Sequence, residues 1–299
     1  MGVAKQLDGS YEISQEGYIR EVIARFGMTG CKPALSPEKT GPKAKLRSLN
    51  RALTPAEAAF MAQVPYRAAV GALWYIARAT RFDIFRATQE VARFVSNPGP
   101  EHWAALERLL RYLSGTAASP LVYRPASWTD PALHAPGLDA RLVGHSDSDW
   151  AGDPDTSKSR SGWIVHFGGC LVAWRSVVQD TIAQSSCEAE YIAAAALANE
   201  IAWWRLLCED LGHPMHGASP IRCDSQAAVA LAKHGGRFEG TKHIRLKYHV
   251  LRQYQAEGLV KATWCPSHHQ YADVLTKNVS VHSFVRIVGL MLGTPYKPS

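Results

Sequence analysis

Two spacings of apolar residues divide the chain into a helical first part and a second part in which strands and helices alternate. In the first part, apolar residues recur three and four positions apart, which is the period of a helix with one buried face. This period predicts helices over about residues 18–28, 66–96 and 100–114. The last has the clearest buried face, formed by Trp103, Leu106, Leu109, Leu110 and Leu113.

The second part starts with three apolar or alternating stretches, which predict three strands joined as hairpins. A long helical pattern follows, and then strands and helices in turn. The predicted strands are 142–149, 162–169, 170–178, 221–225 and 259–266, and the predicted helices are 185–212, 226–234, 243–258 and 271–279. This order predicts an α/β fold with one mixed five-stranded sheet and flanking helices, preceded by a mainly helical domain.

Proline marks the expected boundary between the two parts. Residues 116–140 show neither period and contain Pro120, Pro125, Pro131 and Pro136, which is typical of a linker. We therefore expect a helical domain over 1–115, a linker over 116–140, a second domain over 141–280 and a C-terminal tail over 281–299.

Composition adds a partner class. Of the 299 residues 46% are hydrophobic and 20% charged, which suits packed cores rather than disorder. A net charge of +7 favours a polyanionic partner. There is no apolar signal core at the N-terminus and no run of apolar residues long enough for a membrane span, so we expect an intracellular protein, cytoplasmic or nuclear, not secreted and without a membrane partner. The six scattered cysteines lack zinc-ligand spacing and indicate reduced thiols.

Acidic residues stand where the predicted sheet would gather them. Asp147 ends the first strand, with Asp149 two positions later on the same side. Asp224 ends the strand IRCDS, and Asp273 opens the last predicted helix. Carboxylates collected in this way can hold two divalent metals about 4 Å apart, as phosphodiester hydrolysis often requires.

The long helix offers two glutamates, and their positions predict different roles. Ser185 and Glu188 have the spacing of a capping box, in which the glutamate reaches back to the backbone. Glu190 instead shares its side of the helix with apolar residues, so it must face the sheet. Because a buried carboxylate is costly unless it is paired or binds metal, Glu190 is the predicted ligand. The apolar residues of its stripe are Ala194, Leu197, Ile201, Trp204 and Cys208.

Each of these acids alone has an ordinary structural reading as a turn former, a helix cap or a partner of a helix dipole. The joint pattern is harder to explain in this way, because four acids occupy equivalent places around one sheet. It predicts a metal site formed by Asp147, Glu190, Asp224 and Asp273.

The same residues lie in a series of motifs that resembles the ribonuclease H domain of copia-type LTR retrotransposon Pol polyproteins. The motifs are HSDSDWAGD, SKSRSGW, QSSCEAEYIA, IRCDSQAAVALA, TKHIRLKYHVLR and ADVLTK, in the family's order across about 140 residues. The resemblance implies a ribonuclease H fold, hydrolysis of the RNA strand of RNA–DNA hybrids, and two Mg²⁺ or Mn²⁺ ions held by the four acids as catalytic residues. Cys187 and Ser225 depart from the family's usual threonine and asparagine, and neither position is a metal ligand in that pattern. The role of His268 and His269 stays open.

The first part resembles the segment that follows the polymerase palm in the same polyproteins, the reverse-transcriptase thumb and connection. The motifs are GYIREVIARFGMTGCKP, YRAAVGALWYIARATRFDI and SNPGPEHWAALERLLRYLSGT. The chain has no adjacent pair of aspartates, so the polymerase metal site is absent and no polymerase activity is expected.

The basic segment over residues 237–252 supplies candidate contacts to substrate phosphates. The alternative interpretation is that it forms a helix whose charged side chains face solvent. Trp203 and Trp204 could stack on bases, but Trp204 lies on the same helix stripe as Glu190, so we expect it to belong to the hydrophobic core. Two other functions remain open. One is a catalytically idle fragment that only binds nucleic acid. The other is a transposase or integrase, although the position of the glutamate on the first helix argues against it. The candidate substrate-binding residues are Arg237, Lys242, Arg245, Lys247 and Arg252.

Overall fold

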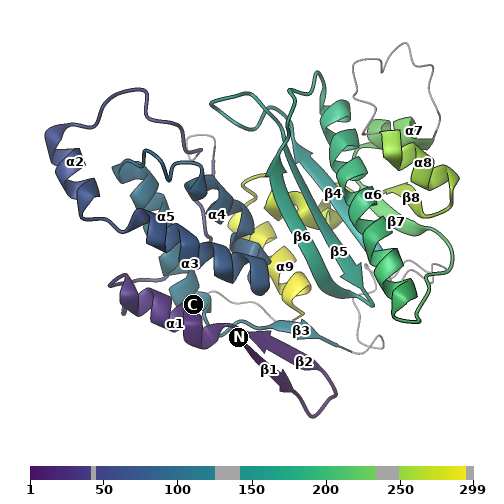
Figure 1. Ribbon diagram of the computed structural model, residues 1–299, viewed down its shortest axis with the longest axis horizontal. Coiled ribbons are helices and arrows are strands. Elements are labelled where there is room, and N and C mark those ends of the chain that lie inside the picture. Colours follow the sequence, from purple (N-terminus) through teal and green to yellow (C-terminus); the bar gives the residue numbers. More distant parts are fainter. Residues whose placement is uncertain (42–44, 125–141, 234–248, 294–299) are drawn as a thin grey trace. The chain divides into compact units, whose positions relative to one another are not determined.

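A computed structural model describes residues 1–41, 45–124, 142–233 and 249–293 of the chain (Figure 1). The chain divides into two compact units. The first unit comprises residues 1–123 and 278–299, and the second comprises residues 124–277.

The first unit combines helices with a small antiparallel sheet. The sheet has the order β1-β2-β3, and β3 comes from far along the chain. Its strands are β1 (Gly2–Lys5), β2 (Tyr11–Ser14) and β3 (Leu121–Tyr123), and its helices are α1 (Glu16–Arg25), α2 (Pro55–Ala62), α3 (Tyr66–Ala79), α4 (Phe85–Ala92), α5 (Pro100–Thr116) and α9 (Val281–Leu292).

A buried ionic network links two helical segments of this unit. Arg81 and Asp83 form an ion pair at 2.7 Å, and both side chains are fully buried. Tyr112 on α5 donates its hydroxyl to Asp83, and Arg81 also donates to Thr116. Because every charged group here has a hydrogen-bonding partner, the cost of burying the pair is offset.

The first unit differs from the sequence-based expectation in three places. The predicted helix over 66–96 is broken by a 3-10 turn between α3 and α4. Part of the expected linker forms strand β3, while residues 125–140 lie outside the described residues. The expected tail over 281–299 contains helix α9, because Phe284, Ile287 and other apolar residues on one side of it are buried, and Phe284 packs edge-on against Tyr112 at 5.9 Å.

The second unit is built on a five-stranded mixed sheet with the order β6-β5-β4-β7-β8, which confirms the predicted sheet. Its first three strands are antiparallel hairpins, and β7 and β8 run parallel to β4. The strands are β4 (Leu142–Asp149), β5 (Arg160–Phe167), β6 (Cys170–Val178), β7 (Ser219–Cys223) and β8 (Val260–Trp264), and the helices are α6 (Ser186–Asp210), α7 (Gln226–Lys233) and α8 (Val250–Ala256).

Helix α6 packs on the sheet through the apolar stripe that the sequence predicted. Ala194, Leu197, Ile201 and Cys208 are buried, and Trp204 is partly buried against the same core. The helix comes close because Gly144 has no side chain: a Cβ there would lie 2.7 Å from the Leu197 side chain. This close packing brings the start of α6 to the end of β4.

Two predicted helices of the second unit have a different outcome. The last one is a 3-10 helix, η7 (Tyr271–Leu275). It is capped by Gln270, whose side chain accepts from the Ala272 N–H. Of the predicted helix over 243–258, residues 243–248 lie outside the described residues and α8 covers Val250–Ala256.

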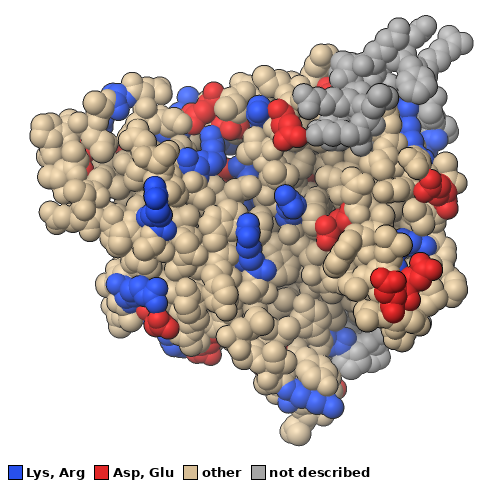
Figure 2. Space-filling view, in the orientation of Figure 1, with Lys and Arg blue, Asp and Glu red and all other residues tan. Residues whose placement is uncertain are grey.

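Basic side chains stand singly or in small groups on the face shown in Figure 2. Within the described residues, no helix has the length and apolarity to cross a membrane.

Candidate active site

Each predicted acid lies on a different element of the second unit. Asp147 is the sixth residue of β4, Glu190 lies in the second turn of α6, Asp224 follows β7 directly, and Asp273 lies in η7. Oxygen atoms of Asp147, Asp224 and Asp273 lie within 4.8 Å of one another, and so do ligand atoms of Glu190, Cys223 and Asp224. Asp224 belongs to both groups, so all four acids form one cluster, the acid cluster.

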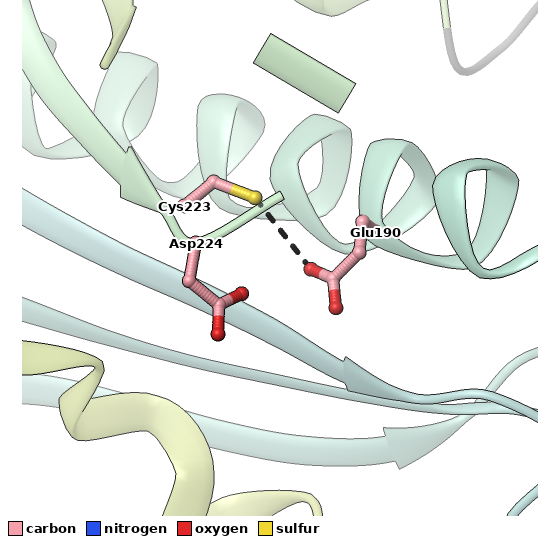
Figure 3. A group of neighbouring side chains, drawn as sticks. All are labelled: Glu190, Cys223 and Asp224. Carbon is pink, nitrogen blue, oxygen red and sulfur yellow. Dashed lines mark hydrogen bonds between the residues drawn. The ribbon is translucent and has the colours of Figure 1, made fainter. Parts of the chain in front are cut away.

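Glu190 is anchored in this cluster by two hydrogen bonds. Its Oε1 accepts from the backbone N–H of Ser148 at 3.2 Å, and the thiol of Cys223 points at Oε2 at 3.6 Å (Figure 3). The side chain is buried. Burial, together with the charge of Asp224, raises the pKa of Glu190 to about 7.

Asp147 is the most deeply buried acid of the cluster, at 1% exposure. The hydroxyl of Thr276 donates to its Oδ2. The chain can approach so closely because the neighbouring strand residue is Gly162, where a Cβ would lie 2.6 Å from the Thr276 methyl group. Burial, followed by the charge of Glu190, raises the pKa of Asp147 well above its usual range.

Asp224 and Asp273 are held by residues of the chain from Trp264, the last residue of β8, onward. Ser267 donates its hydroxyl to Asp224 Oδ2 at 3.0 Å, and the Trp264 indole donates to the backbone carbonyl of Asp224 at 3.2 Å. Burial raises the pKa of Asp273, and the nearby Lys277 ammonium partly offsets the rise. Lys277 Nζ lies 3.1 Å from Asp273 Oδ1 and 3.4 Å from Asp147 Oδ1.

The arrangement suits hard divalent cations. Four carboxylates meet here, two of them buried and two partly exposed, and their mutual repulsion adds to the burial that raises the pKa values of Asp147, Glu190 and Asp273. Oxygen donors of this kind are the ligands that Mg²⁺ and Mn²⁺ prefer.

The chain has sequence relatives among the Pol polyproteins of plant transposons. It is 37% identical over 273 residues to a retrovirus-related Pol polyprotein from transposon TNT 1-94 of Nicotiana tabacum, covering 91% of this chain and 19% of the relative. It is 33% identical over 295 residues to the one from transposon RE2 of Arabidopsis thaliana, covering 98% of this chain and 19% of the relative. The chain belongs to the copia-type Pol polyproteins of transposons. It spans about a fifth of the length of these curated relatives.

No protein-family profile matches the chain. Among solved structures, LC11 ribonuclease H1 in complex with an RNA/DNA hybrid is 16% identical, with a TM-score of 0.34, and the match covers 45% of this chain and 92% of that chain. The sheet order and strand directions of the second unit are those of the mixed five-stranded sheet that the sequence predicts for this Pol segment.

Two further acids of this Pol segment lie outside the acid cluster. Glu188 caps α6, but only in part as predicted: its N–H does donate to Ser185, while its carboxylate accepts from Gln184 N–H at 2.7 Å rather than from Ser185. Asp149 turns toward its own loop, since a Cβ on Gly152 would lie 2.1 Å from the Asp149 carboxylate.

Four predicted substrate-binding residues, Arg237, Lys242, Arg245 and Lys247, lie outside the described residues. The fifth, Arg252, packs within the second unit. Its guanidinium donates to the Leu231 carbonyl at 3.1 Å and lies over the Tyr191 ring. These contacts favour a packing role for Arg252, and its role in substrate binding stays a prediction. His268 is exposed, and its ring is tilted against the ring of His269, with ring centroids 4.2 Å apart.

Among the residues that contact the acid cluster, sequence reasoning missed Cys223, Thr276 and Lys277, besides the hydrogen-bond donors named above. Cys223 was read as an ordinary buried thiol, although its place beside Asp224 in IRCDS is a signal. Thr276 and Lys277 follow Asp273 at positions i+3 and i+4, a spacing that brings side chains together only where the chain turns as a helix.

Proposed function

We propose that the second unit is a metal-dependent endonuclease that hydrolyses the RNA strand of RNA–DNA hybrids. The observation that supports this most is the membership of Asp224 in both ligand groups, which joins the four acids into one continuous cluster. A set of unrelated caps and turn formers would have no reason to converge in this way.

The donor set fits two divalent metals. Asp147, Asp224 and Asp273 would hold one ion, and Glu190 and Asp224 would take part in holding the second. When bound, such ions lower the pKa of water and neutralise charge on a leaving oxygen. A softer ion would also find the thiol of Cys223 in the second group, but burial raises the pKa of this thiol and so favours the protonated, non-ligating form.

The protein's own residues would fix the carboxylates in place. The Ser148 N–H holds Glu190, the Thr276 hydroxyl holds Asp147, and Ser267 holds Asp224. Ligands oriented by hydrogen bonds in this manner lose little entropy when an ion binds. The partly exposed Asp224 leaves the cluster open on one side.

The choice of substrate rests on the family resemblance and on charge. Membership in the Pol polyproteins favours a nucleic-acid substrate, and the net charge of +7 suits a polyanion. The second candidate is an idle fragment that only binds nucleic acid. The intact and convergent set of four acids favours the nuclease, because an idle fragment has no need to bury repelling carboxylates.

One cleavage assay separates these functions. The purified chain is incubated with RNA–DNA hybrid, duplex DNA and duplex RNA of one sequence, each with either strand labelled, in Mg²⁺, in Mn²⁺ and in chelator. The proposal requires cuts in the RNA strand of the hybrid, and only with metal. Binding without cutting would favour the idle fragment, and cuts in duplex DNA would favour a transposase-like activity.

A further inference from the structure

Lys277 reaches into the acid cluster from its solvent-facing side. Its side chain is 40% exposed, while the side chains of its partners Asp147 and Asp273 are 1% and 15% exposed. Its ammonium contacts Oδ1 of both aspartates, at 3.4 Å and 3.1 Å. A lysine stem has four flexible carbons, so the ammonium can leave without moving the backbone.

The Lys277 ammonium contacts the same carboxylates that would hold a metal ion in this ligand group. Asp147 and Asp273 belong to the same ligand group, in which their oxygen atoms and that of Asp224 lie within 4.8 Å of one another. An ammonium bridging two of these three carboxylates takes up oxygens that the ion would use. The two positive charges would also repel each other at short range.

We propose that Lys277 is a positioning residue, a built-in counter-ion of the acid cluster that holds Asp147 and Asp273 together before metal binds and is displaced by the incoming ion. This inference rests on the proposed function. Its consequence is that Lys277 stabilises the metal-free protein and weakens the first binding of metal. A lysine that served packing alone would stabilise the metal-free and metal-bound protein alike.

The test is Mn²⁺ binding to the metal-free full chain, measured by calorimetry and by the electron paramagnetic resonance signal of free Mn²⁺. Lys277→Met removes the charge and keeps the length of the side chain. Lys277→Gln removes the charge and keeps hydrogen-bonding ability, in case the first variant does not fold. Lys261→Met, on an exposed position of β8, is the matched control for loss of one positive charge.

We expect Lys277→Met to bind Mn²⁺ about tenfold more tightly than wild type, because a competing charge is removed. In chelator the same variant should unfold at a lower urea concentration, and Mn²⁺ should close this gap. Lys261→Met should match wild type in both measurements. Lys277→Arg, which keeps the charge, should bind Mn²⁺ no more tightly than wild type.

The outcomes separate this inference from the proposed function. If wild type binds Mn²⁺, Asp224→Asn loses that binding and Lys277→Met binds as wild type does or more weakly, the role of Lys277 is wrong and the metal site stands. If wild type binds no Mn²⁺, or if Asp224→Asn binds it equally well, the metal site itself is wrong and this inference falls with it.

Discussion

The carboxylate of Glu190, on helix α6, accepts a hydrogen bond from the backbone N–H of Ser148, near the end of strand β4, at 3.2 Å. Ser148 directly follows Asp147, so this bond ties the glutamate of the helix to the aspartate of the central strand. Asp147 and Glu190, which are far apart in the sequence, are thereby held together where strand β4 ends. The functional role of Glu190 can be tested apart from its structural role.

Glu190→Gln should reduce hybrid cleavage by about a hundredfold or more, because an amide is a poor replacement for an anionic metal ligand. Its carbonyl can still accept from Ser148 N–H, and a buried charge next to Asp224 is removed. The free energy of unfolding in chelator should therefore stay unchanged or rise. Single-turnover cleavage and urea unfolding measure the two effects.

Glu188→Gln is the matched control, two positions away on the same helix. Glutamine can still accept from Gln184 N–H, so we expect a loss of at most about 1 kcal/mol in stability and no loss of cleavage. If Glu188→Gln were inactive and Glu190→Gln active, the capping and ligand roles would have to be exchanged.

The stability of the metal-free protein should fall as the pH rises. The pKa of Glu190 is about 7 in the folded chain against 4.5 as its ordinary value, so the folded state binds more protons between these values. The stabilisation is complete below 4.5 and is lost as the pH rises through about 7. The shift corresponds to roughly 3 kcal/mol, and the raised pKa values of Asp147 and Asp273 act in the same direction.

Urea unfolding in chelator at about pH 5 and about pH 8 checks this sign. Wild type should be less stable at the higher pH, and Glu190→Gln should show a smaller difference. A wild-type stability that increases between the two values would mean that the attraction of the acids to Lys277 outweighs their burial and mutual repulsion.

The basic segment and Arg252 should behave differently in binding experiments. Replacing Lys242 and Lys247 by alanine should reduce the slope of log affinity against log salt concentration by roughly 1.8 for hybrid and duplex DNA alike, since phosphates are common to both. Preference for cutting RNA should remain, because the strand is distinguished through 2′-hydroxyl contacts and at the metal site. An unchanged slope would favour a solvated segment.

Arg252→Met should leave that slope unchanged and lower stability by about 1–2 kcal/mol, because the guanidinium donates to Leu231 and covers the Tyr191 ring. A reduced slope for Arg252→Met at unchanged stability would return Arg252 to the substrate-binding residues.

The sequence predicted best those features that depend on local periodicity. The sequence pattern predicted strand β4, and the apolar stripe predicted the orientation of α6, so the burial of Glu190 followed from its place on that stripe. The small sheet of the first unit was missed because β1, β2 and β3 have only three or four residues each, too few for a recognisable period. Lys277 was missed because its contact with Asp147 depends on how η7 packs against the sheet, which no local pattern records.

The central claim is that Asp224 joins the two ligand groups of one metal-dependent nuclease site. The most direct measurement compares Asp224→Asn with Asp149→Asn in Mn²⁺ binding and in cleavage of RNA–DNA hybrid. Both variants lose one carboxylate of the same unit, but Asp149 turns toward Gly152 and belongs to neither ligand group. We predict that Asp224→Asn loses both Mn²⁺ binding and cleavage while Asp149→Asn keeps both, and an Asp224→Asn variant that still binds Mn²⁺ and cuts the RNA strand would contradict the account.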